Sequence, residues 1–347
     1  VGDKKIVVFL DYMSLPQKTA QSGITLLQMH AFNVGLMQCV NVLYASTCTM
    51  TILCTKSHEH CLDTRAAYLE SGWPMFECLI SMLIKDSDMV IDLPRALEWI
   101  REKWTRPGDD DPIVQSNQSL YWLREDNRRA TRRPPVHPNE FSKRVKTYTF
   151  TNNSDSDFVD GKYRTTYGDI VGFTKKVDYS DIPLALGDDW KLFLHQVLRD
   201  CNFLVEVDLS RNENIEGATL EPFKAAAGTL EFLCLTNCPG FKGSLEPLRS
   251  CRKLDTLDLA GCVQLEGTVE PLAALPGLDW VDLECCFGLT GDLAPLCGLK
   301  KLKVLNVCDT NLEGATTVAA FQAAKEGVAC AVCLLYTSPS PRDRYIS

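Results

Sequence analysis

The sequence of 347 residues contains no apolar run close to the roughly 18 residues that a membrane-spanning helix needs. It also lacks an excess of basic residues, since 45 Asp and Glu outnumber 36 Lys and Arg and leave a formal net charge of −9. Non-specific contact with nucleic-acid phosphates requires concentrated Lys and Arg. We therefore expect neither a membrane protein nor a nucleic-acid-binding protein, and the acidic balance favours basic partners.

Histidine is scarce, with five residues in the chain. Cys54, His58, His60 and Cys61 are residue types that bind metals, but their spacing fits no standard zinc arrangement, so we predict no metal site and no resident cofactor. The 16 cysteines are dispersed over a long chain, unlike those of a small disulfide-bonded scaffold. We interpret them as reduced thiols in a cytoplasmic protein.

The ends of the sequence predict a fragment. The chain starts at Val1 and strand-like sequence begins within five residues, so we expect an upstream portion to be missing. Residues 333–347 resemble the translation of an adapter used in DNA library preparation, and we set residues 331–347 aside as an artefact.

The strongest pattern is an internal repeat of about 24 residues. Five units of the form LxxLxL, with Val allowed, begin at Leu204, Leu230, Leu254, Leu278 and Leu302. Three residues after the last apolar position of each unit stand Asn212, Cys238, Cys262, Cys286 and Thr310. In that position a side chain can satisfy buried backbone groups where the chain turns out of a strand.

Each unit continues with a Gly at a tight turn and, in four units, a Pro before the return segment. The unit resembles the plant-type leucine-rich repeat. The resemblance predicts a solenoid over residues 201–330, in which one strand of each coil joins a parallel sheet on the concave side. An amphipathic helix over residues 188–200 is expected to cap its N-terminal end.

Upstream, apolar strands predicted at residues 5–11, 50–54 and 89–93 alternate with helices predicted at 24–44 and 65–84. This order is typical of an α/β domain with a parallel sheet covered on both faces, which we place at residues 1–104. Residues 105–146, rich in Pro, Asp and Arg, are predicted to be a linker or extended arm. Residues 147–187 show no clear period and stay unassigned.

The N-terminal region also carries two short motifs. In one, Asp11 at a predicted strand end is followed six residues later by Gln17, and in the other Trp73 precedes Glu77 by four residues. With these motifs the region resembles the Toll/interleukin-receptor (TIR) and heterokaryon-incompatibility superfamily, which implies a truncated flavodoxin-like fold. In NAD-cleaving members of that superfamily the Glu is catalytic. The resemblance therefore implies Glu77 as a catalytic carboxylate, Trp73 as a cleft wall, Asp11 and Gln17 as ligand contacts, and NAD as the substrate.

Strand positions that point out of the predicted concave sheet combine aromatic and acidic side chains. The candidates for partner binding are Glu206, Asp208, Phe232, Asp258, Trp280, Asp282 and Glu284. Exposed aromatic residues surrounded by charge are typical anchors of protein interfaces. This face is suited to a basic partner with an apolar side chain, and the chain's own arm over residues 124–133 is one candidate, with Arg124, Arg128, Arg129, Arg132 and Arg133.

The sequence thus favours an intracellular scaffold or signalling protein that binds other proteins through its repeats. One alternative is a NAD glycohydrolase regulated by the repeats. Another is a repeat protein whose α/β domain serves only as a folding cap.

Overall fold

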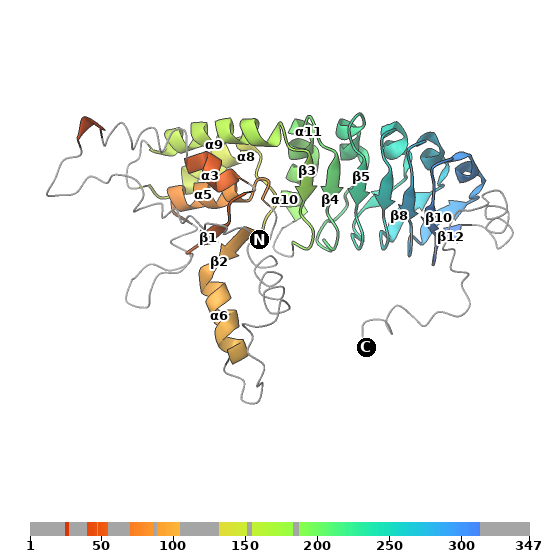
Figure 1. The fold of residues 1–347 in the computed structure, drawn as a ribbon, viewed down its shortest axis with the longest axis horizontal. Coiled ribbons are helices and arrows are strands. Elements are labelled where there is room, and N and C mark those ends of the chain that lie inside the picture. The colour runs from red at the N-terminus through yellow and green to blue at the C-terminus, as the bar shows by residue number, and fades with distance from the viewer. Residues whose placement is uncertain are drawn as a thin grey trace, which may run out of the picture.

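The computed structural model describes residues 25–27, 40–46, 48–54, 70–85, 89–104, 132–150, 155–182 and 187–312. A helical N-terminal part is followed by stacked coils that extend along the long axis of the molecule (Figure 1). No helix within these ranges is both long enough and apolar enough to cross a bilayer. The strand predicted at residues 5–11 lies outside the described ranges.

The N-terminal part contains a small parallel βαβ unit. Its elements are α3 (Val40–Ala45), β1 (Thr51–Leu53), α5 (Gly72–Ser81), β2 (Val90–Asp92) and α6 (Leu93–Trp104). The strands β1 and β2 pair in parallel with Thr51 opposite Val90. Leu53 and Val90 pack with Cys78 and Met82 in a local core, so α5 covers one face of the two strands. The predicted mixed α/β architecture with parallel strands is confirmed here, whereas the TIR-like fold stays a prediction.

The other side of α5 packs against the second of two helices that the sequence analysis did not identify, and that helix packs against the first. They are α8 (Pro138–Arg144), which continues into the 3-10 turn η4 (Val145–Thr147), and α9 (Asp155–Val171). Helix α8 falls within the stretch predicted to be a linker. The buried residues of α9 recur every four positions as Val159, Tyr163, Tyr167 and Val171. Because tyrosines supply half of this stripe, the helical period is weak in hydrophobicity alone.

Two buried cations lie where the N-terminal helices meet the coils. Arg132 is 1% exposed, and its guanidinium lies 4.7 Å from the ring centroid of Tyr179. The buried ammonium of Lys85 donates to the Ser46 and Thr49 carbonyl oxygens at 2.7 and 2.8 Å. Burial, together with the nearby charge of Arg132, lowers the pKa of Lys85 to about 8. Arg132 falls in the predicted linker or extended arm, but its side chain is buried against the aromatic face of Tyr179.

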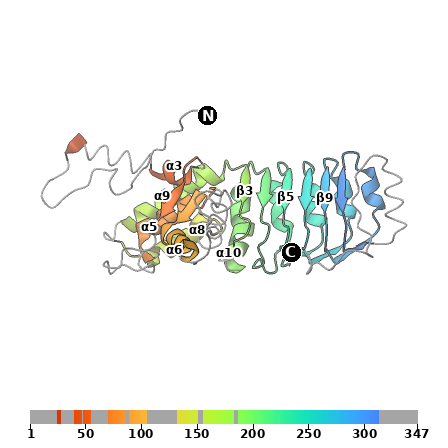
Figure 2. The ribbon, with the colours of Figure 1, turned by 60° about the horizontal axis from the view of Figure 1, so that its bottom comes forward.

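The coils share one six-stranded parallel sheet, whose strands pair in chain order (Figures 1 and 2). They are β3 (Lys176–Asp178), β4 (Glu206–Asp208), β5 (Phe232–Cys234), β7 (Thr256–Asp258), β9 (Trp280–Asp282) and β11 (Val304–Asn306). The last five are the strands of the predicted LxxLxL units, which confirms the leucine-rich-repeat pattern. The first strand, β3, belongs to an additional coil, in which Val177 and Tyr179 take the positions of the leucines.

The helical segment predicted as an end cap is part of this additional coil. It comprises α10 (Gly187–Leu192), the π-helical turn η5 (Phe193–Val197) and α11 (Leu198–Asp200). Trp190, Phe193 and Leu194 are buried as its amphipathic pattern predicts. However, the segment connects β3 to β4, so another strand and the helices α8 and α9 precede it. The predicted capping role of this segment is therefore wrong.

The return path of each later coil is a short 3-10 helix with a proline in its first turn. These helices are η6 (Glu221–Ala226), η7 (Glu246–Ser250), η8 (Glu270–Ala274) and η9 (Ala294–Gly298). A second parallel sheet runs through β6 (Lys242–Gly243), β8 (Gln264–Gly267), β10 (Gly288–Gly291) and β12 (Asn311–Leu312). Between these layers, leucines at successive repeat positions are buried and form one continuous core.

The cysteines of the repeat form a buried ladder. The Sγ atoms of Cys238, Cys262 and Cys286 donate to the carbonyl oxygens of Leu209, Leu235 and Leu259 in the preceding coils, at 2.9, 3.2 and 3.1 Å. In the earlier coil Asn212 has the equivalent role, and its Nδ2 atom donates to the carbonyl oxygens of Tyr179 and Leu209 at 2.7 Å each. The Leu235 and Leu259 oxygens also accept the backbone N–H groups of Cys238 and Cys262, so the thiols give these turn carbonyls a second hydrogen bond.

Candidate functional site

The exposed side of the six-stranded sheet, which we call the open face, consists of two rows of side chains. Each strand contributes one residue on either side of a buried Val or Leu. The first row is Lys176, Glu206, Phe232, Thr256, Trp280 and Val304, and the second is Asp178, Asp208, Cys234, Asp258, Asp282 and Asn306. The predicted partner-binding residues of the strands therefore lie side by side in register.

The second row is acidic for a structural reason. In five of the six coils the Oδ1 atom of the Asp or Asn accepts the backbone N–H two residues further on, at 2.9 to 3.2 Å. The bond holds the start of the loop, in the manner of an Asx turn. Asn306 makes the same bond without a charge, so the fold needs the oxygen atom and not the carboxylate.

Trp280 is a large apolar side chain on this face, and the coil geometry does not require one at its position. It is 47% exposed, and the equivalent positions in the neighbouring coils hold Thr256 and Val304. Phe232 is half-buried on the other side of Thr256. Because adjacent strands lie about 4.8 Å apart, the two aromatic side chains are roughly 10 Å apart with a small residue between them.

Carboxylates surround Trp280 on the C-terminal half of the face. Asp282 follows it on the same strand, Asp258 pairs with Asp282 in register, and Glu284 follows in the loop. The Nδ2 atom of Asn306 donates to Asp282 Oδ2 and Glu284 Oε2, each at 3.1 Å. Burial raises the pKa of Asp282, and the charges of Asp258 and Glu284 raise it further. An added positive charge would relieve this repulsion.

The rim of the face is partly neutralised. The Nζ atom of Lys303 forms an ion pair with Asp279 Oδ2 at 2.5 Å, and both side chains are exposed. Glu231 and Asp255 occupy equivalent positions in the two preceding coils and are exposed. The electrostatic potential of the C-terminal half is therefore set mainly by Asp258, Asp282 and Glu284, together with the exposed rim carboxylates.

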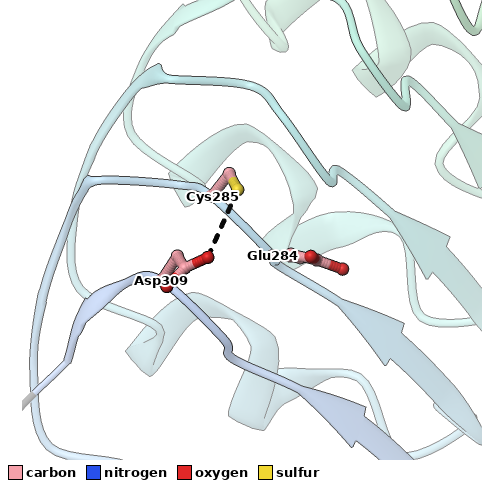
Figure 3. Close-up of side chains that lie close together, drawn as sticks. All are labelled: Glu284, Cys285 and Asp309. Carbon is pink, nitrogen blue, oxygen red and sulfur yellow. Dashed lines mark hydrogen bonds between the residues drawn. The ribbon is translucent and has the colours of Figure 1, made fainter. Parts of the chain in front are cut away.

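A second group of metal-ligand types lies in the loops beside the open face. One atom each of Glu284, Cys285 and Asp309 lies within 4.8 Å of the others. Figure 3 shows Cys285 and Asp309 pointing toward each other, with the carboxylate of Glu284 turned away. The thiol donates to Asp309 Oδ2 at 3.9 Å, while Glu284 accepts from Asn306. The sequence analysis did not identify this group because its members are loop residues of two different coils.

The residues implied by the TIR resemblance are only partly brought together. Asp11 and Gln17 lie outside the described ranges. Trp73 packs against Phe76 and Phe158, with ring centroids 5.9 Å apart in both cases, and its Nε1 donates to Asp155 Oδ2 at 3.1 Å. These contacts hold the indole against α9.

A cavity of about 190 Å³ beside α5 is lined by Met75 and Leu79 but not by Trp73 or Glu77. This geometry gives the cleft-wall role no support. The catalytic role of Glu77 stays a prediction, and so does NAD cleavage.

The arginine arm is only partly described. Arg124, Arg128 and Arg129 lie outside the described ranges. Arg132 is in the core, and Arg133 lines the cavity beside α5. Neither of these two lies on the open face, so the predicted docking of the arm gains no support from them.

Comparison with known proteins gives little beyond the chain's own geometry. No protein-family model matches the sequence, and no curated protein matches it. Among solved structures, an internalin from Listeria monocytogenes is 16% identical, with 48% of this chain and 83% of the internalin covered and a TM-score of 0.26. A leucine-rich-repeat protein from Leptospira interrogans is 11% identical, with 58% of this chain and 63% of that chain covered and a TM-score of 0.29. TM-scores this low support no conclusion about the fold, and the evidence for the repeat is the strand register described above.

Proposed function

We propose that this chain binds proteins through the open face of its leucine-rich-repeat solenoid, and that its partner presents a basic segment carrying an apolar side chain. The observation that carries the proposal is the exposed Trp280, placed between small neighbours and beside Asp258 and Asp282. Tryptophan is strongly enriched among residues that dominate binding energy at interfaces. An arginine side chain fits the position best, because its guanidinium stacks on an indole and pairs with carboxylates.

The charge around Trp280 supports the same partner. The Asx-turn bonds explain why the second row contains Asp or Asn, but they do not explain why Asp is used at both 258 and 282. Two adjacent carboxylates repel each other, and the raised pKa of Asp282 reflects this repulsion together with burial. Binding of a basic partner would offset the repulsion between these carboxylates with attraction between opposite charges.

A cytoplasmic role as a scaffold or signalling protein is part of the proposal. Most of the cysteines in the described ranges are buried, and each of them is a free thiol, as expected in a reducing compartment. Several of the buried thiols donate to backbone carbonyls, which a disulfide would prevent.

The test is a titration of the full chain with a fluorescein-labelled peptide that alternates arginine and leucine, followed by fluorescence anisotropy. Trp280→Ala should weaken binding by about tenfold or more, equivalent to about 1.4 kcal/mol. The double variant Asp258→Asn/Asp282→Asn should also weaken binding while keeping both Asx-turn bonds. The matched control Asp178→Asn/Asp208→Asn removes two charges from the other end of the same row and should have a smaller effect.

Two results would overturn the proposal. In one, Trp280→Ala binds the peptide as tightly as the unmodified chain. In the other, the two Asp→Asn pairs weaken binding equally, which would mean that the peptide responds to overall charge.

A further inference from the structure

The chain has a second exposed aromatic surface, remote from Trp280. Phe173 and Phe203 are 68% and 49% exposed, and their rings stack with centroids 5.9 Å apart and planes 9° apart. In the strand register, residue 173 of the first coil is equivalent to residue 203 of the second. The two rings therefore form a pair at the edge where the strands of the sheet begin.

The coil geometry does not require aromatic residues at this edge. The equivalent positions of the next four coils hold Thr229, Lys253, Gly277 and Lys301. Stacking of two rings contributes about 0.5–1.5 kcal/mol, but together the two residues still expose more surface than one whole phenylalanine. An exposed apolar group of this size indicates an interaction site when polar residues surround it.

A cavity of about 550 Å³ adjoins the ring pair. Its apolar wall consists of Ile84, Ile170 and Phe173, so it lies where the N-terminal helices meet the first coil. Its charged groups are Lys175, Lys176 and Asp169. The lining therefore combines apolar side chains with a net positive charge, in a protein whose overall charge is −9.

Both lysines are exposed. Among the ion pairs formed within the described ranges none includes either of them, although Glu206 is next to Lys176 in register. Their ammonium groups are thus available to a ligand carboxylate. A recess lined by isoleucine and phenylalanine can accept one or two apolar side chains of that ligand.

We propose that this surface, formed by Ile84, Ile170, Phe173, Phe203, Lys175 and Lys176, docks an acidic amphipathic segment of a partner protein. Apolar side chains of the segment enter the cavity and cover the ring pair, while its carboxylates pair with the two lysines. The cavity beside the rings can enclose side chains of a protein segment, which the headgroups of a bilayer do not supply. The surface has the opposite charge preference to the Trp280 region, so the two sites would bind different segments.

The test uses the full chain and a fluorescein-labelled synthetic peptide with leucine and phenylalanine at helical i, i+3, i+4 and i+7 positions and glutamate elsewhere. We expect binding that weakens at high salt and falls by about tenfold or more in Phe173→Ser/Phe203→Ser. Lys175→Glu/Lys176→Glu should give a similar loss while the chain stays folded, although the second change puts like charges opposite Glu206 and should lower the unfolding temperature slightly. A peptide with glutamine in place of glutamate, which carries no charge for either site, should bind less.

Matched variants separate this site from the other one. Lys253→Glu/Lys301→Glu changes two exposed lysines at the same edge, and Trp280→Ala changes the open face, so both should bind the acidic peptide as the unmodified chain does. If the Lys175/Lys176 variant also binds unchanged, the proposal is wrong. It is equally wrong if the chain binds vesicles containing phosphatidylserine but not the peptide.

Discussion

Five of the six strands of the open face end at a side chain that bonds back to the main chain, and this gives a prediction at the scale of one residue. Asp258→Ala removes the acceptor for the N–H of Ala260 and should lower the free energy of unfolding by about 1 kcal/mol. Asp258→Asn keeps the oxygen, as Asn306 does, and should unfold at nearly the same urea concentration as the unmodified chain. Equal destabilisation by both changes would show that the charge, not the turn bond, matters for stability.

The buried thiols predict loss of stability at alkaline pH. Burial raises the pKa of Cys238 and of Cys286 to about 12, whereas an unfolded thiol ionises near pH 8.5. A raised folded-state pKa means that the contribution to stability is complete below about pH 8.5 and is lost as pH rises toward 12. Each thiol then lowers the free energy of unfolding by at most about 1.4 kcal/mol per pH unit.

Cys286→Ser tests this prediction because its hydroxyl can donate to the Leu259 oxygen and does not ionise in that range. In urea unfolding from pH 8 to 10.5, the variant should lose less stability with pH than the unmodified chain. Parallel curves for the two proteins would contradict the prediction.

At the scale of elements, the predictable parts were those whose buried side chains are aliphatic. Five strands of the six-stranded sheet, β4, β5, β7, β9 and β11, follow the leucine spacing directly. Strand β3 and helix α9 were missed because tyrosines, a threonine and valines occupy their buried positions. Tyr163 is buried as completely as a leucine, but it needs a partner for its hydroxyl, which donates to the Val136 oxygen at 2.7 Å. Such a partner can be known only from the tertiary structure.

The stacking of coils predicts a strong effect at Gly240. A Cβ atom there would lie 1.5 Å from the Ile215 carbonyl oxygen of the preceding coil, a backbone atom that cannot move aside cheaply. Gly240→Ala should therefore destabilise the chain by about 2 kcal/mol, in the range of overpacked cores. Gly228→Ala is the matched control, since nothing lies within 4 Å of its Cβ position. Thermal unfolding of both variants distinguishes the two, and equal unfolding temperatures would refute the packing argument.

At the scale of the whole molecule, one hydrophobic core extends from α5 to the last described coil. It passes through Tyr179, whose ring lies under Arg132 and whose hydroxyl donates to the Leu83 oxygen. Phe193 and Trp190 continue this core into the coils, with ring centroids 5.8 Å apart. The N-terminal helices therefore share their buried surface with the repeats.

A shared core predicts that helices and coils unfold together. In urea, circular dichroism and tryptophan fluorescence should report a single transition with one midpoint for the full chain. Phe193→Ala, which opens a cavity where helices and coils meet, should lower that midpoint for both probes equally. Two separate transitions in the unmodified chain would show that the N-terminal helices fold independently of the repeats.

The sequence by itself determined the repeat, because leucines every 24 residues can be buried together only if successive coils stack in register. It also determined which side chains of each strand face outward, since alternation along a strand is local. Tertiary structure alone decided that Arg132 is buried, that the helix at 187–200 belongs to a coil, and that Phe173 meets Phe203. Each of these depends on contacts between segments far apart in sequence or on burial of polar atoms. A periodic pattern along the sequence reveals neither.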